Sequence, residues 1–146
     1  MVSRFKECQT VLPIAITKNS NFTTEAGNLQ VFIPDEMDKN KGLNQFIEMY
    51  STRTKASQEY WLFDVSLWET LTEVVNGLND LPLDLDDDLY LYQRKGKSLE
   101  LWEFFEMHPT RPRKLLFYGS WNKIDGLTVE ETSKWTRRGD FEVILY

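Results

Sequence analysis

Residues 60–92 read YWLFDVSLWETLTEVVNGLNDLPLDLDDDLYLY, and this stretch decides the fold class. It starts with a continuous apolar run, Tyr60–Val65, which is broken by one acid and is typical of a buried strand. A stripe of apolar residues at helical spacing follows, and Gly77 and Asn79 end it. The run Leu89–Tyr92 is the next strand. This alternation predicts an α/β unit with parallel strands.

The start of the helix is predicted at Ser66, because Ser66 and Glu69 form a capping-box pattern. In that pattern the Ser66 hydroxyl accepts a hydrogen bond from the third helical N–H, while the Glu69 side chain reaches back. The apolar stripe behind this start consists of Trp68, Leu71, Val74, Val75 and Leu78.

Similar patterns flank the central stretch. We predict further strands at 29–33, 99–107, 114–118 and 141–146, and further helices over 43–50 and 129–135. Residues 99–107 also fit a helical turn, but Leu99, Leu101, Phe105 and Met107 share one face of a strand that only Glu103 interrupts. The fold class is therefore α/β, with at least three parallel strands and a β-rich C-terminal tail. We expect a loosely ordered segment at 1–27, an α/β lobe at 28–122 and a linker-like tail at 123–146.

Composition restricts the possible classes of protein. The chain has 146 residues, the usual length of one domain, and its 14% aromatic content is too high for a disordered chain. A formal net charge of −6 argues against nucleic-acid binding, which needs a surplus of Lys and Arg. No stretch contains the roughly 20 consecutive apolar residues of a membrane span. Residues 1–11 lack the apolar run of a signal peptide.

Charge is distributed unevenly along the chain. Residues 79–106 carry eight acidic and three basic residues, whereas residues 107–139 carry seven basic and three acidic ones. Adjacent blocks of opposite sign can pair in space or face different partners. Because most charge runs are simply solvated, we favour two solvated faces.

Five aspartates form the densest group of candidate metal ligands: Asp80, Asp84, Asp86, Asp87 and Asp88. A calcium loop starting at Asp84 would need Gly at its sixth position and Glu at its twelfth, where this chain has Leu89 and Lys95. Paired carboxylates could instead act as general acid and base, but only in a cleft that shifts their pKa values. We favour a polar loop between helix and strand, and predict no metal site.

Single residues limit the chemistry further. Cys8 and His108 are the only residues of their types, which excludes an internal disulfide and a Cys/His zinc site. The chain has no nucleophile elbow, phosphate loop or dinucleotide-binding turn. His108 stands before Pro109, as expected of a residue that ends a strand, and nothing near Cys8 marks an activated thiol. We therefore predict no enzymatic activity and no cofactor.

Two tryptophans and one asparagine are candidates for surface roles. Trp121 and Trp135 stand among polar neighbours, so each could anchor a partner, although a half-buried structural role is favoured. Asn21 begins the sequon Asn-Phe-Thr, and glycosylation there would place it on an extracellular surface.

An ordered series of motifs resembles the insect chemosensory ionotropic receptors, which are relatives of the ionotropic glutamate receptors. The family has an acidic strand start, a strand similar to Leu-x-Glu-Val-Tyr-x-x-His-Pro, then Tyr-Gly-x-Trp, Gly-Leu and an Arg-Arg-x-Asp/Asn-Leu/Phe step. The matching segments are LDLDDDLY (83–90), LWEFFEMHP (101–109), LLFYGSWN (115–122), GL (126–127) and KWTRRGDF (134–141). The segments FIEMY (46–50) and YWLFDV (60–65) resemble an upstream helix and strand of the same family.

The resemblance implies a three-layer lobe of the periplasmic-binding-protein kind, in the extracellular N-terminal region of a ligand-gated channel at the plasma membrane. It also implies sibling or co-receptor subunits as partners. Five residues match the linker into the ligand-binding domain: Trp135, Arg137, Arg138, Asp140 and Phe141. Family members continue after that motif with a Gly and the ligand-binding lobe, whereas residues 142–146 read EVILY. The resemblance therefore implies a fragment, a truncated gene model or a short isoform.

Two other classes remain open on the sequence alone. A free-standing α/β domain could bind a small ligand or a protein through Trp121 and Trp135. An enzyme could use the aspartate group with a divalent metal, although the calcium-loop spacing and the single His offer little support.

Overall fold

The computed structural model of the chain describes residues 20–24, 27–34, 38–53, 59–107, 112–129 and 134–139. Side chains are described from Gln30 onward, except that of Lys134. The strand expected at 141–146, and the candidate residues Cys8, His108, Asp140 and Phe141, lie outside these ranges.

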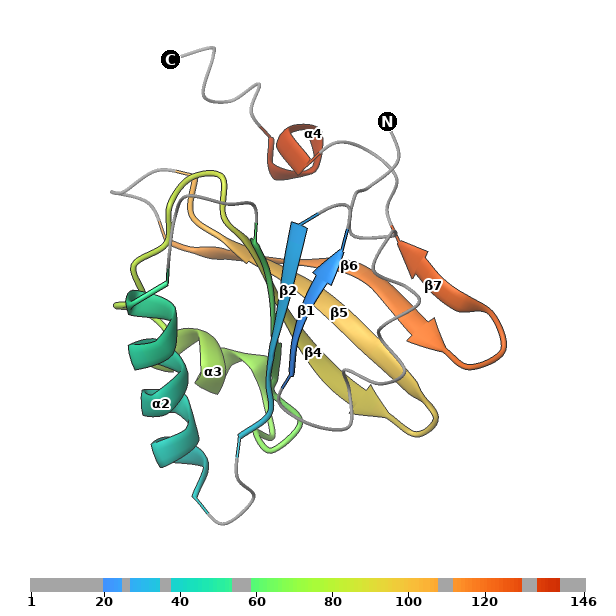
Figure 1. Cartoon of the computed structure of the whole chain (residues 1–146), viewed down its shortest axis with the longest axis horizontal. Helices are drawn as coiled ribbons and strands as arrows, with labels where there is room; N and C mark the ends of the chain where they lie inside the picture. Colours follow the sequence, from blue (N-terminus) through green and yellow to red (C-terminus); the bar gives the residue numbers. More distant parts are fainter. Residues whose placement is uncertain are drawn as a thin grey trace.

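A single mixed sheet of seven strands organises the described chain (Figure 1). The strands are β1 (Ser20–Thr24), β2 (Gly27–Phe32), β3 (Glu59–Asp64), β4 (Asp88–Lys95), β5 (Ser98–Phe105), β6 (Lys114–Asn122) and β7 (Gly126–Val129). Their order in the sheet equals their order in the chain. β2, β3 and β4 are parallel, and every other neighbouring pair is antiparallel. This confirms the α/β class and the three parallel neighbours, after which β5, β6 and β7 continue the sheet in antiparallel order.

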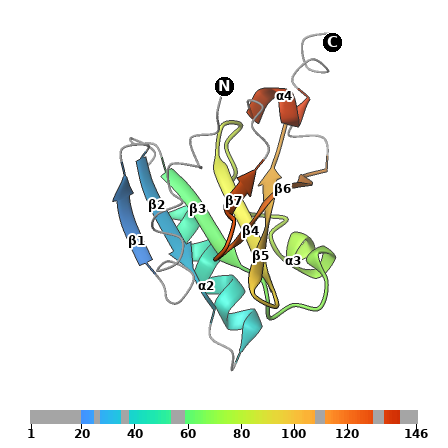
Figure 2. The same ribbon diagram turned by 90° about the vertical axis from the view of Figure 1, so that its right-hand side faces the viewer.

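Two crossover helices join the parallel strands: α2 (Lys39–Ser51) and α3 (Leu71–Gly77). Both lie on the same side of the sheet (Figure 1), as expected when two successive crossovers of one hand run in the same direction. A short helix, α4 (Lys134–Arg138), lies beyond the sheet at the end where β4 begins. Figure 2 shows how strongly the sheet twists between β1 and β7. Among the described residues, helices thus cover one face, and the expected third layer is not seen.

Aromatic rings fill the space between the helices and the sheet. Phe46 of α2 stacks on Phe63 of β3 with ring centroids 4.2 Å apart, and Tyr50 meets Trp61 edge to face at 5.0 Å. Phe46, Tyr50 and Phe63 are fully buried. The apolar stripe of α2 therefore packs on β3, which explains why the helical spacing at 43–50 was predictable.

The opposite face of the sheet carries a second buried cluster that is rich in tyrosine. Tyr60, Tyr90, Tyr92 and Tyr118 come from β3, β4 and β6 and belong to it. Burial raises the pKa of Tyr90 and Tyr92 well above the usual value for tyrosine. Strands buried on both faces are expected to read as nearly continuous apolar runs, which is what β3 and β4 show.

The predicted helix start at Ser66 is wrong. The helix begins at Leu71, and Thr70 is the N-cap residue, with its Oγ1 accepting from the Glu73 N–H at 3.3 Å. Thr70 and Glu73 repeat the same capping-box spacing four residues later. Ser66 instead follows β3, where its N–H donates to Asp64 and its hydroxyl accepts from the Arg94 N–H. The sequence thus contains two capping-box patterns. The first, at Ser66, lies in the turn that follows β3, and the second, at Thr70, caps the helix.

Two other boundaries differ from those predicted. β6 does not end at Gly119 but runs to Asn122, because residues 119–122 pair with β7 as the neighbouring strand, Gly119 opposite Val129. A Cβ atom at Gly119 would stand 2.3 Å from the Thr128 carbonyl oxygen, so only glycine permits this approach. Val129 ends β7 and is not helical, and α4 is described only from Lys134. The short strands β1 and β7 were not predicted.

The structure places the expected domain boundaries within one sheet. The boundary at 27/28 falls inside β2, and that at 122/123 falls between β6 and β7. No described helix is long and apolar enough to cross a membrane.

Candidate functional site

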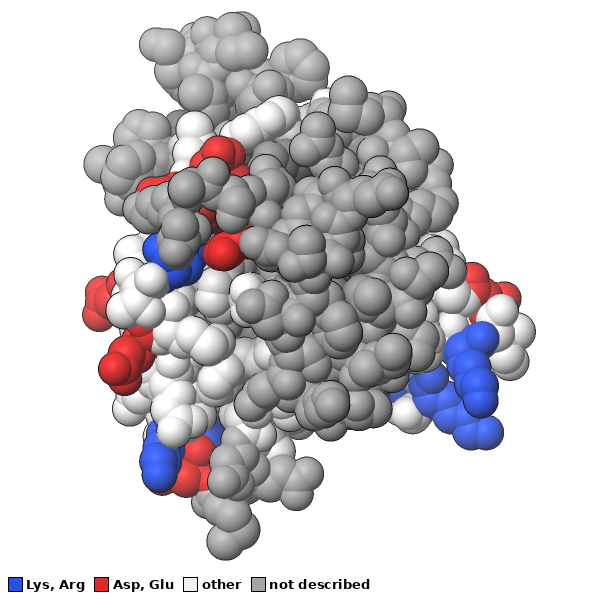
Figure 3. Space-filling view, viewed as in Figure 1, with Lys and Arg blue, Asp and Glu red and all other residues white. Residues whose placement is uncertain are grey.

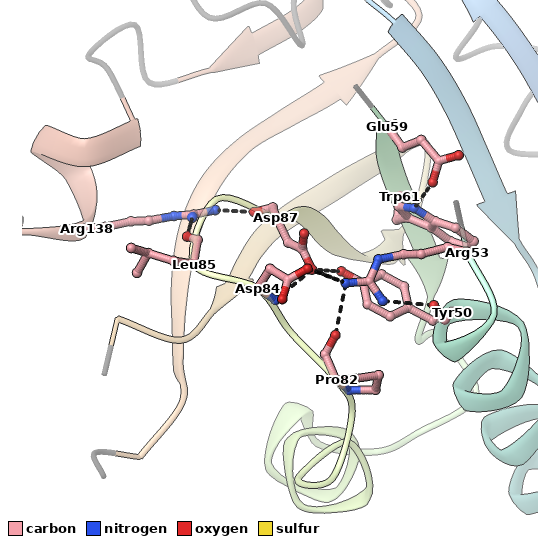
Figure 4. Close-up of polar contacts among 9 residues, drawn as sticks. All are labelled: Tyr50, Arg53, Glu59, Trp61, Pro82, Asp84, Leu85, Asp87 and Arg138. Atoms are coloured by element: carbon pink, nitrogen blue, oxygen red, sulfur yellow. Dashed lines mark hydrogen bonds and ion pairs between the residues drawn. The ribbon is translucent and has the colours of Figure 1, made fainter. Parts of the chain in front are cut away.

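The densest polar network of the described chain lies at the amino-terminal end of β4. The end of α2, the loop at 80–87, β5 and α4 meet there (Figure 4). This end of the sheet contains most of the polar residues singled out from the sequence, so we treat it as the candidate site. Two carboxylates organise it, those of Asp87 and Glu103.

Asp87 joins its own loop to the last turn of α2. Its Oδ2 accepts from Tyr50 Oη at 2.6 Å, from Arg53 Nη2 at 2.7 Å and from the Asp84 N–H at 2.9 Å. Arg53 also donates to the Pro82 carbonyl at 3.0 Å and to Asp84 Oδ2 at 3.3 Å. Its side chain is only 5% exposed, and its guanidinium lies 3.9 Å from the centre of the Tyr50 ring. The loop is therefore fixed to α2 by charge-assisted bonds.

Tyr50 stays protonated in this setting. Burial raises the pKa of its hydroxyl far above the usual value, and the hydrogen bond to Asp87 raises it further. A neutral hydroxyl beside a carboxylate is a hydrogen-bond donor, not a base. Tyr50 therefore acts as a structural tie between α2 and the loop.

Glu103 of β5 is fully buried and binds two consecutive arginines of α4. Arg137 donates from Nε to Oε1 and from Nη2 to Oε2, both at 3.1 Å. Arg138 donates to Oε2 from Nε at 3.1 Å and from Nη2 at 2.9 Å. Burial alone would lower the pKa of Arg137, but the hydrogen bond and the charge of Glu103 outweigh it and raise that pKa. Removing either sign of charge would leave the other buried without compensation.

Arg138 connects Glu103 to the loop that carries Asp87. Besides Glu103 it donates to the backbone carbonyls of Leu85 at 3.1 Å and Asp87 at 2.9 Å (Figure 4). The residue is 3% exposed, and its guanidinium lies 4.7 Å from the centre of the Phe105 ring. The planar fork of arginine satisfies all of these acceptors at once, which the single ammonium of lysine could not do.

The sequence contained a signal for this site. Leu99, Leu101 and Phe105 are buried residues on alternate positions of β5, and Glu103 interrupts that row. A lone acid in an apolar strand face needs a buried partner, because an unpaired buried charge is very costly. The sequence did not reveal that the partner is the Arg137–Arg138 pair, since the contact spans more than thirty residues. The predicted two solvated faces are therefore wrong at this point: the acidic and basic blocks pair.

A second pair joins the same two blocks nearby. Arg113 donates from Nε to Glu106 Oε1 at 3.2 Å and from Nη1 to the Leu78 carbonyl at 2.7 Å. This arginine ties the segment before β6 to the end of α3.

The aspartates do not form one group. Asp84 and Asp87 bind Arg53, Asp88 is buried at the start of β4, and Asp80 and Asp86 are exposed. Among the residues that the structure describes, no three His, Cys, Asp or Glu side chains are placed to hold a metal ion.

The two candidate tryptophans differ in exposure. Trp121 is 9% exposed and packs in the tyrosine-rich cluster, which leaves it little surface for a partner. Trp135 is half-buried in α4, two positions before Arg137 in the chain. The backbone of Asn21 lies in β1, which is the first strand in the sheet order.

The carboxyl-terminal ends of β3 and β4 carry a smaller polar group. Arg94 donates from Nε to Asp64 Oδ2 at 3.3 Å, and the Arg94 side chain is 42% exposed. Tyr92 Oη is buried and has no hydrogen-bond partner within the described part of the chain. Small ligands in open α/β sheets usually bind at this end, where strand order reverses. The order β2-β3-β4 does not reverse, so the usual crevice is absent from this group of strands.

Comparisons of the chain with models of known protein families, with curated proteins and with solved structures gave no match. The residues and their geometry are therefore the basis for any statement about function.

Proposed function

We propose that this chain is a non-catalytic extracellular N-terminal module of a ligand-gated chemosensory channel of the ionotropic receptor family. The proposal starts from the ordered motifs between Asp84 and Phe141, which resemble that family. It also agrees with the mixed α/β sheet of the described residues. Sibling or co-receptor subunits at the plasma membrane are the proposed partners.

The observation that carries the proposal is the way Glu103 binds the linker motif. The part of the motif that the structure describes, 134–139, is not a loose tail: both of its arginines bind Glu103 within the fold. A connector that transmits movement between two domains needs a defined docking site on the first one. The module would thus support assembly of the receptor and coupling to the ligand-binding domain, and would take no part in ion conduction.

The direct test is to sequence the full-length transcripts that contain these codons. We expect a reading frame that continues beyond Tyr146 into two ligand-binding lobes and three hydrophobic spans. If the reading frame ends after the Tyr146 codon in every transcript, the proposal is wrong.

Glycosylation gives a biochemical test of the extracellular assignment. When the chain is expressed in insect cells behind a secretory leader, we expect a glycan at Asn21, seen as a mobility shift that an amidase for N-glycans reverses. Asn21→Gln should remove the shift, whereas Asn28→Gln, outside any sequon, should keep it. A secreted wild-type chain without the glycan would argue against the proposed location.

A second candidate is a free-standing domain that binds a protein through an exposed apolar surface. Phe117 is 54% exposed and meets Trp102 edge to face at 5.3 Å, so this pair offers an aromatic anchor. A purified chain that is monomeric and folds cooperatively, from a transcript that ends at Tyr146, would favour this candidate. Phe117→Ser would then abolish capture of the partner without lowering the melting temperature.

A further inference from the structure

We propose that α4 is a detachable strap, and that its docking on Glu103 controls the order of the loop at 82–87 and of the last turn of α2. The inference rests on the proposed function for one point only, the identity of the domain that would pull on the strap. The contacts themselves lie within this chain.

The first step runs from α4 to the loop. Arg138 is the residue that binds both Glu103 and the carbonyls of Leu85 and Asp87. When α4 leaves, these two carbonyls lose their donor at the same moment as Glu103 loses its arginines. Docking of the strap and order of the loop are therefore one event, not two.

The second step runs from the loop to α2 through a single residue. The backbone carbonyl of Asp87 faces Arg138, while its carboxylate accepts from Tyr50 and Arg53 (Figure 4). A shift of the Asp87 backbone moves its carboxylate away from Tyr50 of α2 and from Arg53, which follows the C-cap of that helix. Arg53 then also loses the Pro82 carbonyl on the same loop.

The third step concerns which states are possible. Glu103 is fully buried, so its charge is compensated only with the arginines in place or with water admitted. Arg137 and Arg138 are consecutive residues of one five-residue helix and bind the same carboxylate, so we expect them to dock and to leave together. The strap therefore has two states, docked and released, which is what a switch between domains requires.

Hydrogen exchange measured by mass spectrometry on the whole chain tests the strap. In Arg138→Gln we expect the amides of Asp84, Asp87, Thr52 and Arg53 to exchange about tenfold faster than in the wild type. These amides are bonded within the loop or the last turn of α2. The exchange rates of β3 and of α3 should change less than twofold.

Arg113→Gln is the matched control. Arg113 also binds one carboxylate and one backbone carbonyl, those of Glu106 and Leu78, and its side chain is 12% exposed. Its loss should speed exchange near Leu78 and Leu81, at the end of α3, and leave the loop at 82–87 unchanged.

Asp87→Asn tests whether the effect of Arg138 reaches the end of α2 through the Asp87 carboxylate. It should speed exchange at Thr52 and Arg53 by itself, and Arg138→Gln added to it should give no further increase there. If Arg138→Gln proves unfolded by circular dichroism, Arg138→Lys replaces it, since lysine keeps the charge but not the fork.

Two results would overturn the strap. One is faster exchange confined to 134–139, and the other is an equal increase in every strand, which would mean global destabilisation. Because the measurement uses this chain alone, its outcome is independent of the transcript test. The strap can fail while the receptor assignment stands, and the reverse also holds.

Discussion

The two ends of β4 carry similar residues in different settings. At its carboxyl-terminal end, Asp64 binds an arginine whose side chain is 42% exposed, and a buried tyrosine hydroxyl nearby has no described partner. At its amino-terminal end, Asp87 and Glu103 bind arginines that are between 0% and 8% exposed. The distribution of charge in space is shown in Figure 3 for one face of the molecule.

The difference shows that the buried polar contacts between segments lie at the amino-terminal end of β4. Open α/β sheets usually place their ligand chemistry at the carboxyl-terminal ends of parallel strands. Here the polar network is at the other end, and it joins α2, a loop, β5 and α4. Such a network suits attachment of one segment to another, and this agrees with the proposed role as a coupling module.

The largest expected effect follows from removing the buried carboxylate. Glu103→Ala leaves Arg137 and Arg138 buried without a counter-charge, and should lower the free energy of unfolding by about 3–5 kcal/mol. Asp64→Ala, at the carboxyl-terminal end, should cost less than half as much, because Arg94 can turn to water. Urea denaturation of both variants measures the difference, and equal losses would remove the contrast between the two ends.

Alkaline pH should destabilise both ends. The pKa values of Tyr50, Tyr90 and Tyr92 are raised in the folded chain, chiefly by burial. Their contribution to the stability of the fold is fully present below the pKa of an unfolded tyrosine, about 10. It is lost progressively as the pH rises above that value toward the raised pKa of the folded state. Each should lower the free energy of unfolding by about 1.4 kcal/mol per pH unit above 10. Tyrosinate absorbance should appear together with unfolding; a separate earlier ionisation of three tyrosines would contradict their burial.

Replacing Arg53 or Arg94 should lower the free energy of unfolding by less than replacing Glu103, and by different amounts at the two ends of β4. Arg53→Gln removes charge-assisted bonds to Asp84, Asp87 and a carbonyl from a nearly buried side chain, and should cost about 1.5–3 kcal/mol. Arg94→Gln removes a half-exposed pair and should cost about 0–1 kcal/mol. Urea denaturation at low and high salt separates them, since added salt should weaken only the Arg94 effect. A salt-sensitive Arg53 would show that its site is open to solvent.

The smallest effect distinguishes two buried hydroxyls. Tyr50→Phe removes a donor to Asp87 and should cost about 1 kcal/mol, whereas Tyr92→Phe removes a hydroxyl without a described partner and should be neutral or slightly stabilising. Thermal melts of the two variants compare them directly. A loss of stability in Tyr92→Phe equal to that in Tyr50→Phe would reveal a partner at the carboxyl-terminal end.

The sequence predicted the elements with a strong pattern and missed those with a weak one. β3, β4, β5 and α2 were predictable because long apolar runs or stripes specify buried strands and helices. The hairpin strands β1 and β7 have five and four residues, too few to show a pattern. The helix start was misplaced because Ser66 and Thr70 both begin a capping box, and only packing decides between them.

The candidate site was predictable only in its parts. Arg137 and Arg138 were singled out by the family resemblance, and Glu103 was visible as an interruption of an apolar row. What joins them is a contact across 34 and 35 residues, which local patterns do not encode. The aspartates drew attention as a group, yet the roles of Asp84 and Asp87 depend on Arg53, just beyond the end of α2, which no motif identified.

A double-mutant cycle between Glu103 and Arg138 tests the attachment of the strap most directly. The wild type, Glu103→Gln, Arg138→Gln and the double variant are compared by urea denaturation. We expect the double variant to lose at least about 1.5 kcal/mol less than the sum of the single losses, as for groups in one buried network. Additive losses, within about 0.5 kcal/mol, would mean that Arg138 and Glu103 do not hold each other, and would contradict the anchoring of α4 to the sheet.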